Sequence, residues 1–282
     1  MIALRTFLAL SRAAALPTVW SNCLAGWWLS GGGPLARLPL LFAGATFLHL
    51  GGAFLNDALD ATYDRQFRRV RPIPSGIVTP AAVLSWGLAW LLLGQVCLFA
   101  LGKAAGGLGL ALTLCAVVYN ATHRLVTFSP LFLGLCRFLL YIIAGTAAAK
   151  GPSGWAIWCG LALALYVIGA RCLPRPENIL GQADYWPVSL LAAPILLALF
   201  MDADGYRLPA LELSAVLGLW VLYCLRRAFW PLERNFARAV SGLMAGIVLV
   251  DWLAVVDAPR QLSLVFLGLF GATLLLERVA PP

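Results

Sequence analysis

The sequence has few charged residues and no clustered cysteines. Of its 282 residues, 11% are Asp, Glu, Lys or Arg and 62% are hydrophobic, and the mean hydropathy is +0.88. This composition excludes a soluble globular domain. The seven cysteines form no Cys-x-x-Cys pair and lie in apolar runs. They therefore indicate small core residues, and neither a zinc site nor a disulfide framework.

Apolar runs recur along the chain, and several reach the ~20 residues that a helix needs to cross a bilayer. Ten runs are candidate spans: Ser11 to Ser30, Leu38 to Leu55, Pro80 to Leu101, Ala104 to Ala121, Pro130 to Ala149, Trp155 to Cys172, Pro187 to Met201, Pro209 to Leu225, Ala237 to Val256 and Leu262 to Leu276. We therefore predict an all-α, multi-pass integral membrane protein. Residues 1–282 are expected to form a single helical bundle around a central cavity.

The formal net charge of +8 comes from arginines that fall unevenly between the two sides of the predicted bundle. If the N-terminus is cytoplasmic, the cytoplasmic side collects Arg5, Arg12, Arg65, Arg68, Arg69, Arg71, Arg124, Arg171, Arg175, Arg226, Arg227, Arg234, Arg238 and Arg278. Only five basic residues fall between spans on the other side, a strong positive-inside bias. The charge thus indicates topology and contact with anionic lipid in the bilayer, and we expect no nucleic-acid binding.

The end of the second apolar run carries a cluster of acids. Three of the twelve acidic residues lie within the eight residues 57–64. A continuing helix places Asn56, Asp60 and Asp64 on one face, with Asp57 one turn before Asp60. Carboxylate and amide oxygens are the hard ligands that Mg²⁺ prefers. The pattern therefore predicts a Mg²⁺ site at one end of a membrane helix.

Four arginines follow this cluster directly: Arg65, Arg68, Arg69 and Arg71. Arginine forks bind phosphate oxygens, and Mg²⁺ commonly keeps phosphate oxygens in its shell. Pro72, Pro74 and Gly76 then end the helix and favour a rigid loop that can cover the site. The combination predicts a metal-bound diphosphate held at the membrane.

The order Asn-Asp-x-x-Asp-x-x-x-Asp followed by Arg-Pro-Ile-Pro-Ser-Gly resembles the UbiA superfamily of intramembrane prenyltransferases. The resemblance implies a bundle of nine helices, so nine or ten transmembrane helices are expected here. It also implies that Asn56, Asp57, Asp60 and Asp64 bind Mg²⁺ and diphosphate, and that Arg68 and Arg71 steady the phosphates. The specific motifs fill only residues 56–76. The arginine bias puts these residues on the cytoplasmic face.

Three polar residues inside the spans are further candidates. Asn22 either contacts substrate or makes a packing hydrogen bond. His49 lies on the face of the acids, two turns deeper, as a polar contact to the acceptor or as a histidine bonded to a neighbouring helix. Arg137 lies ~12 Å inside a span, so it must face a cavity or an acid. It is expected to reach the diphosphate or an aspartate, with a structural ion pair as the alternative.

Two further groups stand near the predicted cytoplasmic ends of spans. Tyr119, Asn120 and Arg124 line the site by resemblance, or else form a solvated loop end. The second group comprises Arg171, Glu177 and Asp184, where the family has a second aspartate-rich motif that this chain departs from. Either one metal is held less completely, or arginines replace it as counter-charge, or catalysis is lost.

The leading hypothesis is Mg²⁺-dependent transfer of a prenyl group from an isoprenoid diphosphate donor to an aromatic or otherwise hydrophobic lipid acceptor, catalysed by Asp57, Asp60, Asp64 and Arg137. The alternative is a diverged, non-catalytic protein of this kind that binds or translocates a lipid phosphate. A CDP-alcohol phosphotransferase is disfavoured, because its Asp-Gly motif is missing from residues 60–64.

Overall fold

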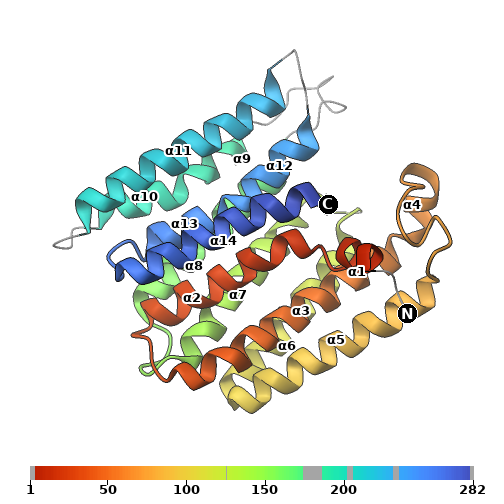
Figure 1. The fold of residues 1–282 in the computed structure, drawn as a ribbon, viewed down its shortest axis with the longest axis horizontal. Coiled ribbons are helices and arrows are strands. Elements are labelled where there is room, and N and C mark those ends of the chain that lie inside the picture. The colour runs from red at the N-terminus through yellow and green to blue at the C-terminus, as the bar shows by residue number, and fades with distance from the viewer. Residues whose placement is uncertain (1–3, 125, 174–185, 202–205, 231–234, 280–282) are drawn as a thin grey trace.

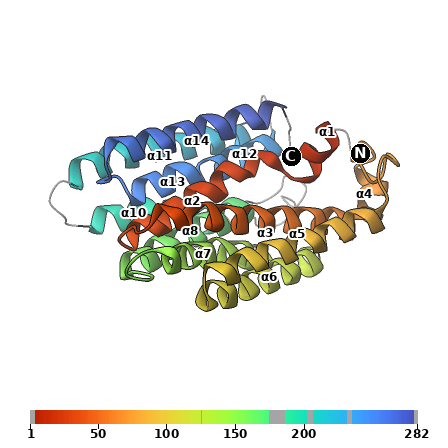
Figure 2. The same ribbon diagram turned by 60° about the horizontal axis from the view of Figure 1, so that its bottom comes forward.

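The computed structural model describes residues 4–124, 126–173, 186–201, 206–230 and 235–279. These residues form a bundle of α-helices with short 3₁₀ turns, and the long helices run side by side (Figures 1 and 2). The helices of the N-terminal half are α1 (Leu4–Leu10), α2 (Leu16–Leu29), α3 (Leu38–Leu59), α4 (Ala61–Phe67), α5 (Pro80–Leu101), α6 (Lys103–Thr122) and α7 (Pro130–Ala147). They are followed by α8 (Gly154–Arg171), α9 (Trp186–Ser189), α10 (Ala193–Phe200), α11 (Arg207–Phe229), α12 (Phe236–Ala245), α13 (Ile247–Ala254) and α14 (Arg260–Val279).

Eight helical segments of the described chain are long and apolar enough to cross a membrane. They confirm eight of the ten predicted runs as helices of spanning length: Leu35–Leu59, Pro80–Leu101, Lys103–Thr122, Pro130–Ala147, Gly154–Arg171, Arg207–Phe229, Phe236–Ala254 and Arg260–Val279. The start of several is visible in the sequence. Thr79 caps α5 by accepting a hydrogen bond from the Ala82 amide at 3.2 Å, and Pro80 follows it.

The other two predicted spans form shorter helices. The run Ser11 to Ser30 is interrupted at Arg12, which has a left-handed backbone, and by a 3₁₀ turn at Ala13–Ala15, so α2 has 14 residues. The run Pro187 to Met201 divides into α9, a 3₁₀ turn at Leu190–Ala192 and α10. The hydropathy of the two runs predicted that they are apolar, but it did not predict where their helices are interrupted.

The packing of α3 against α5 positions the polar end of α3. Gly51 on α3 lies so close to α5 that an added Cβ would stand 2.6 Å from Cγ and 2.9 Å from the backbone nitrogen of Leu91. Gly94 on α5 makes the reciprocal approach to Leu48 of α3. Small residues at such crossings allow helices to approach closely inside a membrane.

Replacing Gly51 by alanine is therefore expected to destabilise the protein by about 1–3 kcal/mol, because the methyl group overpacks the α3–α5 contact. The neighbouring Gly52 provides a matched control, since an added Cβ there meets no atom within 4 Å. Thermal unfolding in detergent measures both variants. Equal stability of Gly51→Ala and Gly52→Ala would contradict the described crossing.

One end of the bundle gathers the polar segments. The short helices α1 and α4 and the C-terminal end of α14 lie at this end (Figures 1 and 2). The last turn of α3 ends here as well, beside the start of α5. The predicted acid cluster therefore lies at one mouth of the bundle.

Candidate functional site

The four predicted acid-motif residues lie on one continuous face across the junction of α3 and α4. The Asp60 amide donates to the Asn56 carbonyl and the Asp64 amide donates to the Asp60 carbonyl, each at 2.9 Å. The helical four-residue spacing is thus kept although α3 ends at Leu59. Asn56, Asp57, Asp60 and Asp64 are all buried, with exposed fractions of 5%, 7%, 5% and 1%. Buried carboxylates need a counter-charge or a metal.

Arginines supply that counter-charge. Arg71 donates from Nη1 to Asp64 Oδ2 at 2.8 Å and to Asp57 Oδ1 at 3.3 Å. It therefore closes the loop after α4 over the acids, as the Pro-rich sequence indicated. Arg68, which was predicted beside Arg71, is exposed and makes no ion pair with the described residues.

Arg12 is a site residue that the sequence interpretation missed. Its Nη2 donates to Asn56 Oδ1 in a short hydrogen bond and approaches Asp57 Oδ1 at 3.3 Å. Arg12 has φ +46°, the only positive φ among the described non-glycine residues. A left-handed backbone is unfavourable for a residue with a long side chain, and such strain clusters at functional sites. Its side chain is about one-third exposed, so it lies at the mouth of the site.

The C-terminal end of α6 forms another wall. Asn56 Nδ2 donates to Asn120 Oδ1 at 3.0 Å, and Asn120 Nδ2 donates to the Gly52 carbonyl at 3.1 Å. Arg124 Nε donates to Asp60 Oδ1 at 2.7 Å. The structure therefore brings Asn120 and Arg124 against the acids, rather than leaving them in a solvated loop.

Two aromatic residues accompany this wall. Tyr119 stacks on His123 with ring centroids 5.3 Å apart, and His123 Nε2 lies 3.4 Å from Asp60 Oδ1. Tyr119 thus reaches the acids only through His123, which was not among the predicted site residues. The signal for His123 was its position directly before Arg124.

A second polar network lies within the bundle and contains two predicted site residues. Arg137 donates to Asn22 Oδ1 at 2.7 Å and to Thr18 Oγ1 at 2.9 Å. Asn22 Nδ2 donates to Asp251 Oδ2 at 2.6 Å, and Tyr141 donates to Asp251 Oδ1 at 2.5 Å. Asp251, which lies in α13, therefore accepts hydrogen bonds from side chains of two other helices. Arg137 meets an acid only through Asn22, and makes no ion pair with Asp57, Asp60 or Asp64.

The remaining predicted residues are placed differently. Arg171 is the last residue of α8, is exposed, and makes no ion pair with the described acids. His49 is in α3, and its Nε2 is buried without a hydrogen-bond partner in the described chain. Glu177 and Asp184 lie outside the described residues.

The acid motif has the donor chemistry of a Mg²⁺ site. It offers hard carboxylate and amide oxygens, and Asp64 Oδ1 is buried without a hydrogen-bond partner. Three other carboxylate oxygens are occupied by arginines, on Asp57, Asp60 and Asp64. Within the described ranges, no three His, Cys, Asp or Glu side chains converge as a ready metal site. The donor chemistry therefore suits a hard cation, whereas the carboxylates as placed are bound by arginines and do not converge on one metal position.

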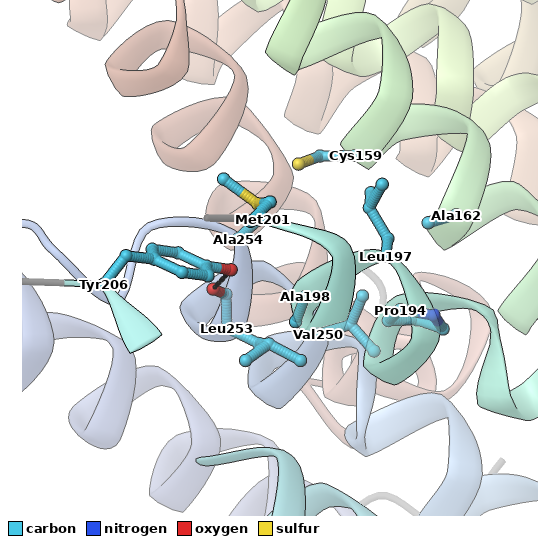
Figure 3. A pocket seen from close by; sticks show the side chains of 10 residues that line it. All are labelled: Cys159, Ala162, Pro194, Leu197, Ala198, Met201, Tyr206, Val250, Leu253 and Ala254. Carbon is cyan, nitrogen blue, oxygen red and sulfur yellow. Dashed lines mark hydrogen bonds between the residues drawn. The ribbon is translucent and has the colours of Figure 1, made fainter. Parts of the chain in front are cut away.

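An apolar pocket lies elsewhere in the bundle, between α8, α10 and α13 (Figure 3). Its lining includes Cys159, Met201 and Val250, and the Tyr206 hydroxyl donates to the Leu253 carbonyl at 3.0 Å. The acid-motif residues are not part of this lining. The candidate site is therefore the mouth formed by α3, α4 and α6, with Arg12 and Arg71 across it.

The chain resembles several curated proteins over part of its length. It is 31% identical over 124 residues to the prenyltransferase stbC of Stachybotrys bisbyi, covering 40% of this chain and 37% of that protein. It is 32% identical over 173 residues to the mitochondrial 4-hydroxybenzoate polyprenyltransferase of Arabidopsis thaliana, covering 60% and 41%. It is 24% identical over 154 residues to the digeranylgeranylglyceryl phosphate synthase of Methanothrix thermoacetophila, covering 54% and 57%. The matches thus span between about a third and three fifths of these relatives.

Solved structures share the whole fold at low identity. A UbiA homologue from Aeropyrum pernix K1 aligns with a TM-score of 0.65 and 20% identity, covering 91% of this chain and 98% of that one. A UbiA homologue from Archaeoglobus fulgidus, bound to GPP and Mg²⁺, aligns with a TM-score of 0.54 and 12% identity, covering 97% of each chain. The UbiA prenyltransferase family matches residues 14–172, which contain the entire acid motif together with Arg71 and Arg124, but not Arg12. The chain therefore belongs to the UbiA prenyltransferase family.

Proposed function

We propose that this protein is a membrane enzyme that transfers a prenyl group from an isoprenoid diphosphate to a hydrophobic or aromatic acceptor, with Mg²⁺ as cofactor. The observation that carries the proposal is the buried acid motif facing Arg12, Arg71 and Arg124 at the mouth of the bundle. In such a site, a bound metal ion and the arginine guanidinium groups would together neutralise the negative charges of a diphosphate. The solved homologue with bound GPP and Mg²⁺ supports the same chemistry in a protein of this fold.

Asn56, Asp57, Asp60 and Asp64 would hold the metal. When bound, Mg²⁺ would polarise the diphosphate oxygens and favour departure of the leaving group. Arg12, Arg71 and Arg124 are placed to bind the phosphate oxygens with charge-assisted hydrogen bonds. The burial of the acids keeps bulk water away from their charges, which strengthens these interactions.

The other polar residues of the candidate site and of the bundle interior have supporting roles in this proposal. Asn120 orients Asn56 through the hydrogen bond between their side chains. His123 borders Asp60, and Tyr119 stacks on His123. Arg137 and Asn22 hold the interior of the bundle, where they are available to a substrate that reaches deeper. Arg68 and Arg171 are proposed as outer contacts of the diphosphate. Glu177 and Asp184, outside the described residues, are proposed to bind substrate through a cation.

The proposal includes a membrane orientation. We take the chain as a single domain in which the eight long helices cross the bilayer. The number of crossings is nine or ten, according to whether one or both of α2 and the α9–α10 segment also cross. The arginine excess at the mouth side supports a cytoplasmic position of the site, because positively charged residues gather on the cytoplasmic side of membrane proteins.

Labelled geranylgeranyl diphosphate tests the function in proteoliposomes. The protein is incubated with Mg²⁺ and, in turn, an aromatic carboxylic acid or a phosphorylated glycerol ether lipid. Release of diphosphate with a labelled product is expected for one acceptor class. Binding of the donor with no release of diphosphate under any of these conditions would contradict an enzymatic function.

That contrary result would favour a non-catalytic protein that binds or translocates a lipid phosphate. The observation in its favour is that arginines already occupy the carboxylates, while no three acids converge in the described chain. A fluorescent prenyl phosphate placed in one leaflet of the proteoliposome would then report translocation.

Arg12→Gln is expected to weaken binding of a prenyl diphosphate analogue by about tenfold, because one charge-assisted contact is lost at the mouth. Arg5→Gln is the matched control, since Arg5 is exposed on the same N-terminal segment and makes no ion pair with the described residues. Isothermal titration in detergent measures both variants. Equal affinity of the two would exclude Arg12 from the site.

A further inference from the structure

The short helix α4 and the turn after it present an apolar stripe outward. Tyr63, Phe67 and Val70 have exposed fractions of 40%, 66% and 96%. Tyr63 and Phe67 lie four residues apart on one face of α4, and Val70 follows in the turn beyond the end of the helix. Ala61 and Asp64 of the same helix are buried. This element therefore turns its polar motif inward and its apolar side chains outward, the reverse of a helix that faces water.

Three arginines flank this stripe. Arg65, Arg68 and Arg69 are exposed, and none forms an ion pair with an acid in the described chain. The nearby acids are already taken, since Asp64 binds Arg71 and Asp60 binds Arg124. The outward surface, which we call the α4 patch, thus consists of Tyr63, Phe67, Val70, Arg65, Arg68 and Arg69. It combines exposed apolar area with uncompensated positive charge.

The position of the α4 patch fixes its depth relative to a bilayer. The spanning helix α3 ends at Leu59 and the spanning helix α5 begins at Pro80. The patch connects these two ends and lies at the mouth end of the bundle (Figure 1). A segment in that place meets the headgroup level of the membrane. Apolar side chains beside arginines are the composition that binds there, with positive charge favouring anionic lipids.

We infer that the α4 patch docks on the anionic headgroup surface of the bilayer. Phe67 and Val70 enter the acyl boundary, while Arg65 and Arg69 bind lipid phosphates. A chain of contacts joins the docked surface to the site. Phe67 packs on Tyr63 with centroids 4.5 Å apart, the Arg124 guanidinium lies 3.5 Å from the Tyr63 ring centroid, and Arg124 binds Asp60. Docking thereby steadies one wall of the mouth, whatever reaction occurs there.

Photo-crosslinking from position 67 tests the docking. Phe67 is replaced by p-benzoylphenylalanine in the full chain, and the protein is placed in nanodiscs of neutral lipid or with about one third phosphatidylglycerol. Mass spectrometry counts lipid adducts after irradiation. We expect the yield to rise about threefold with the anionic lipid. In Arg65→Gln/Arg69→Gln protein it is expected to return to the neutral-lipid value.

Two controls make the result decisive. The same photoreactive residue at Phe99, exposed within the α5 span, should form lipid adducts equally in both membranes. Arg37→Gln/Arg260→Gln removes two arginines at the starts of α3 and α14, and it should leave the adduct yield at position 67 unchanged. A yield at position 67 that is independent of phosphatidylglycerol, or unaffected by Arg65→Gln/Arg69→Gln, would overturn the docking. Because the readout involves no turnover, it is independent of the proposed function.

Discussion

Asp60→Asn is expected to lower Mg²⁺-dependent prenyl transfer on the order of 100-fold, while the protein remains folded. The amide keeps the shape of the carboxylate and an oxygen for Arg124, which binds Asp60 at 2.7 Å. It removes the negative charge that a hard cation requires, at a position only 5% exposed. Initial rates at saturating Mg²⁺ and donor, together with the melting temperature, measure the effect.

Asp257→Asn is the matched control for this substitution. Asp257 is exposed and follows α13, and its side chain is not among those of the acid motif. Its activity should equal that of the wild type. Full activity of Asp60→Asn, with a melting temperature close to that of the wild type, would show that catalysis does not depend on the acid motif.

Asp251→Ala is expected to cost about 3 kcal/mol of stability, the largest structural effect among the single substitutions considered. Asp251 is fully buried and accepts hydrogen bonds from Ser21, Asn22 and Tyr141. Alanine leaves the Asn22 amide and the Tyr141 hydroxyl without this acceptor, whereas Ser21 keeps the Thr18 carbonyl. It also removes the negative charge that Arg137 approaches through Asn22. The melting temperature in detergent reports the loss.

Asp251→Asn distinguishes charge from hydrogen bonding in this network. The asparagine side chain retains one acceptor, its carbonyl oxygen, so we expect a smaller loss of stability than in Asp251→Ala. Asp257→Ala, at the exposed position, should leave the melting temperature unchanged. A melting temperature of Asp251→Ala equal to that of the wild type would show that the network adds nothing to the fold.

The long helices could be predicted because hydropathy is a local property of each segment. Thr79 and Pro80 mark the start of α5, and eight apolar runs became helices of spanning length. The break at Arg12 could not be predicted in this way. Its left-handed backbone accompanies contacts with Asn56 and Asp57, 44 and 45 residues away. Such long-range contacts leave no trace in local hydropathy.

The acid motif shows the same division between local and distant information. The four-residue spacing of Asn56, Asp60 and Asp64 predicted a shared face, and the backbone hydrogen bonds show it. Which arginine binds each acidic side chain depends on how segments that are distant in the sequence pack together. Arg71 lies in the adjacent loop and was predicted, whereas Arg12 reaches the motif from the N-terminal segment and was missed.

Arg137 illustrates why burial alone does not identify a partner. Its depth in a span required a polar neighbour, and the expectation was a diphosphate or an aspartate. In the structure its neighbours are Thr18 and Asn22, because α7 packs against α2. The side-chain amide of Asn22 and the hydroxyl of Thr18 are the polar neighbours that the buried Arg137 requires. The hydropathy of the sequence does not show whether such a neighbour is an amide, a hydroxyl or an acid.

Binding of a non-hydrolysable geranylgeranyl diphosphate analogue tests the central claim most directly. The protein is titrated in detergent with and without Mg²⁺, as wild type and as Asp57→Asn. The account predicts tight binding of the wild type only when Mg²⁺ is present, and loss of that dependence in the variant, because Asp57 lies between Arg12 and Arg71 at the mouth. Equal affinity with and without Mg²⁺, unchanged in Asp57→Asn, would contradict a metal-dependent diphosphate site.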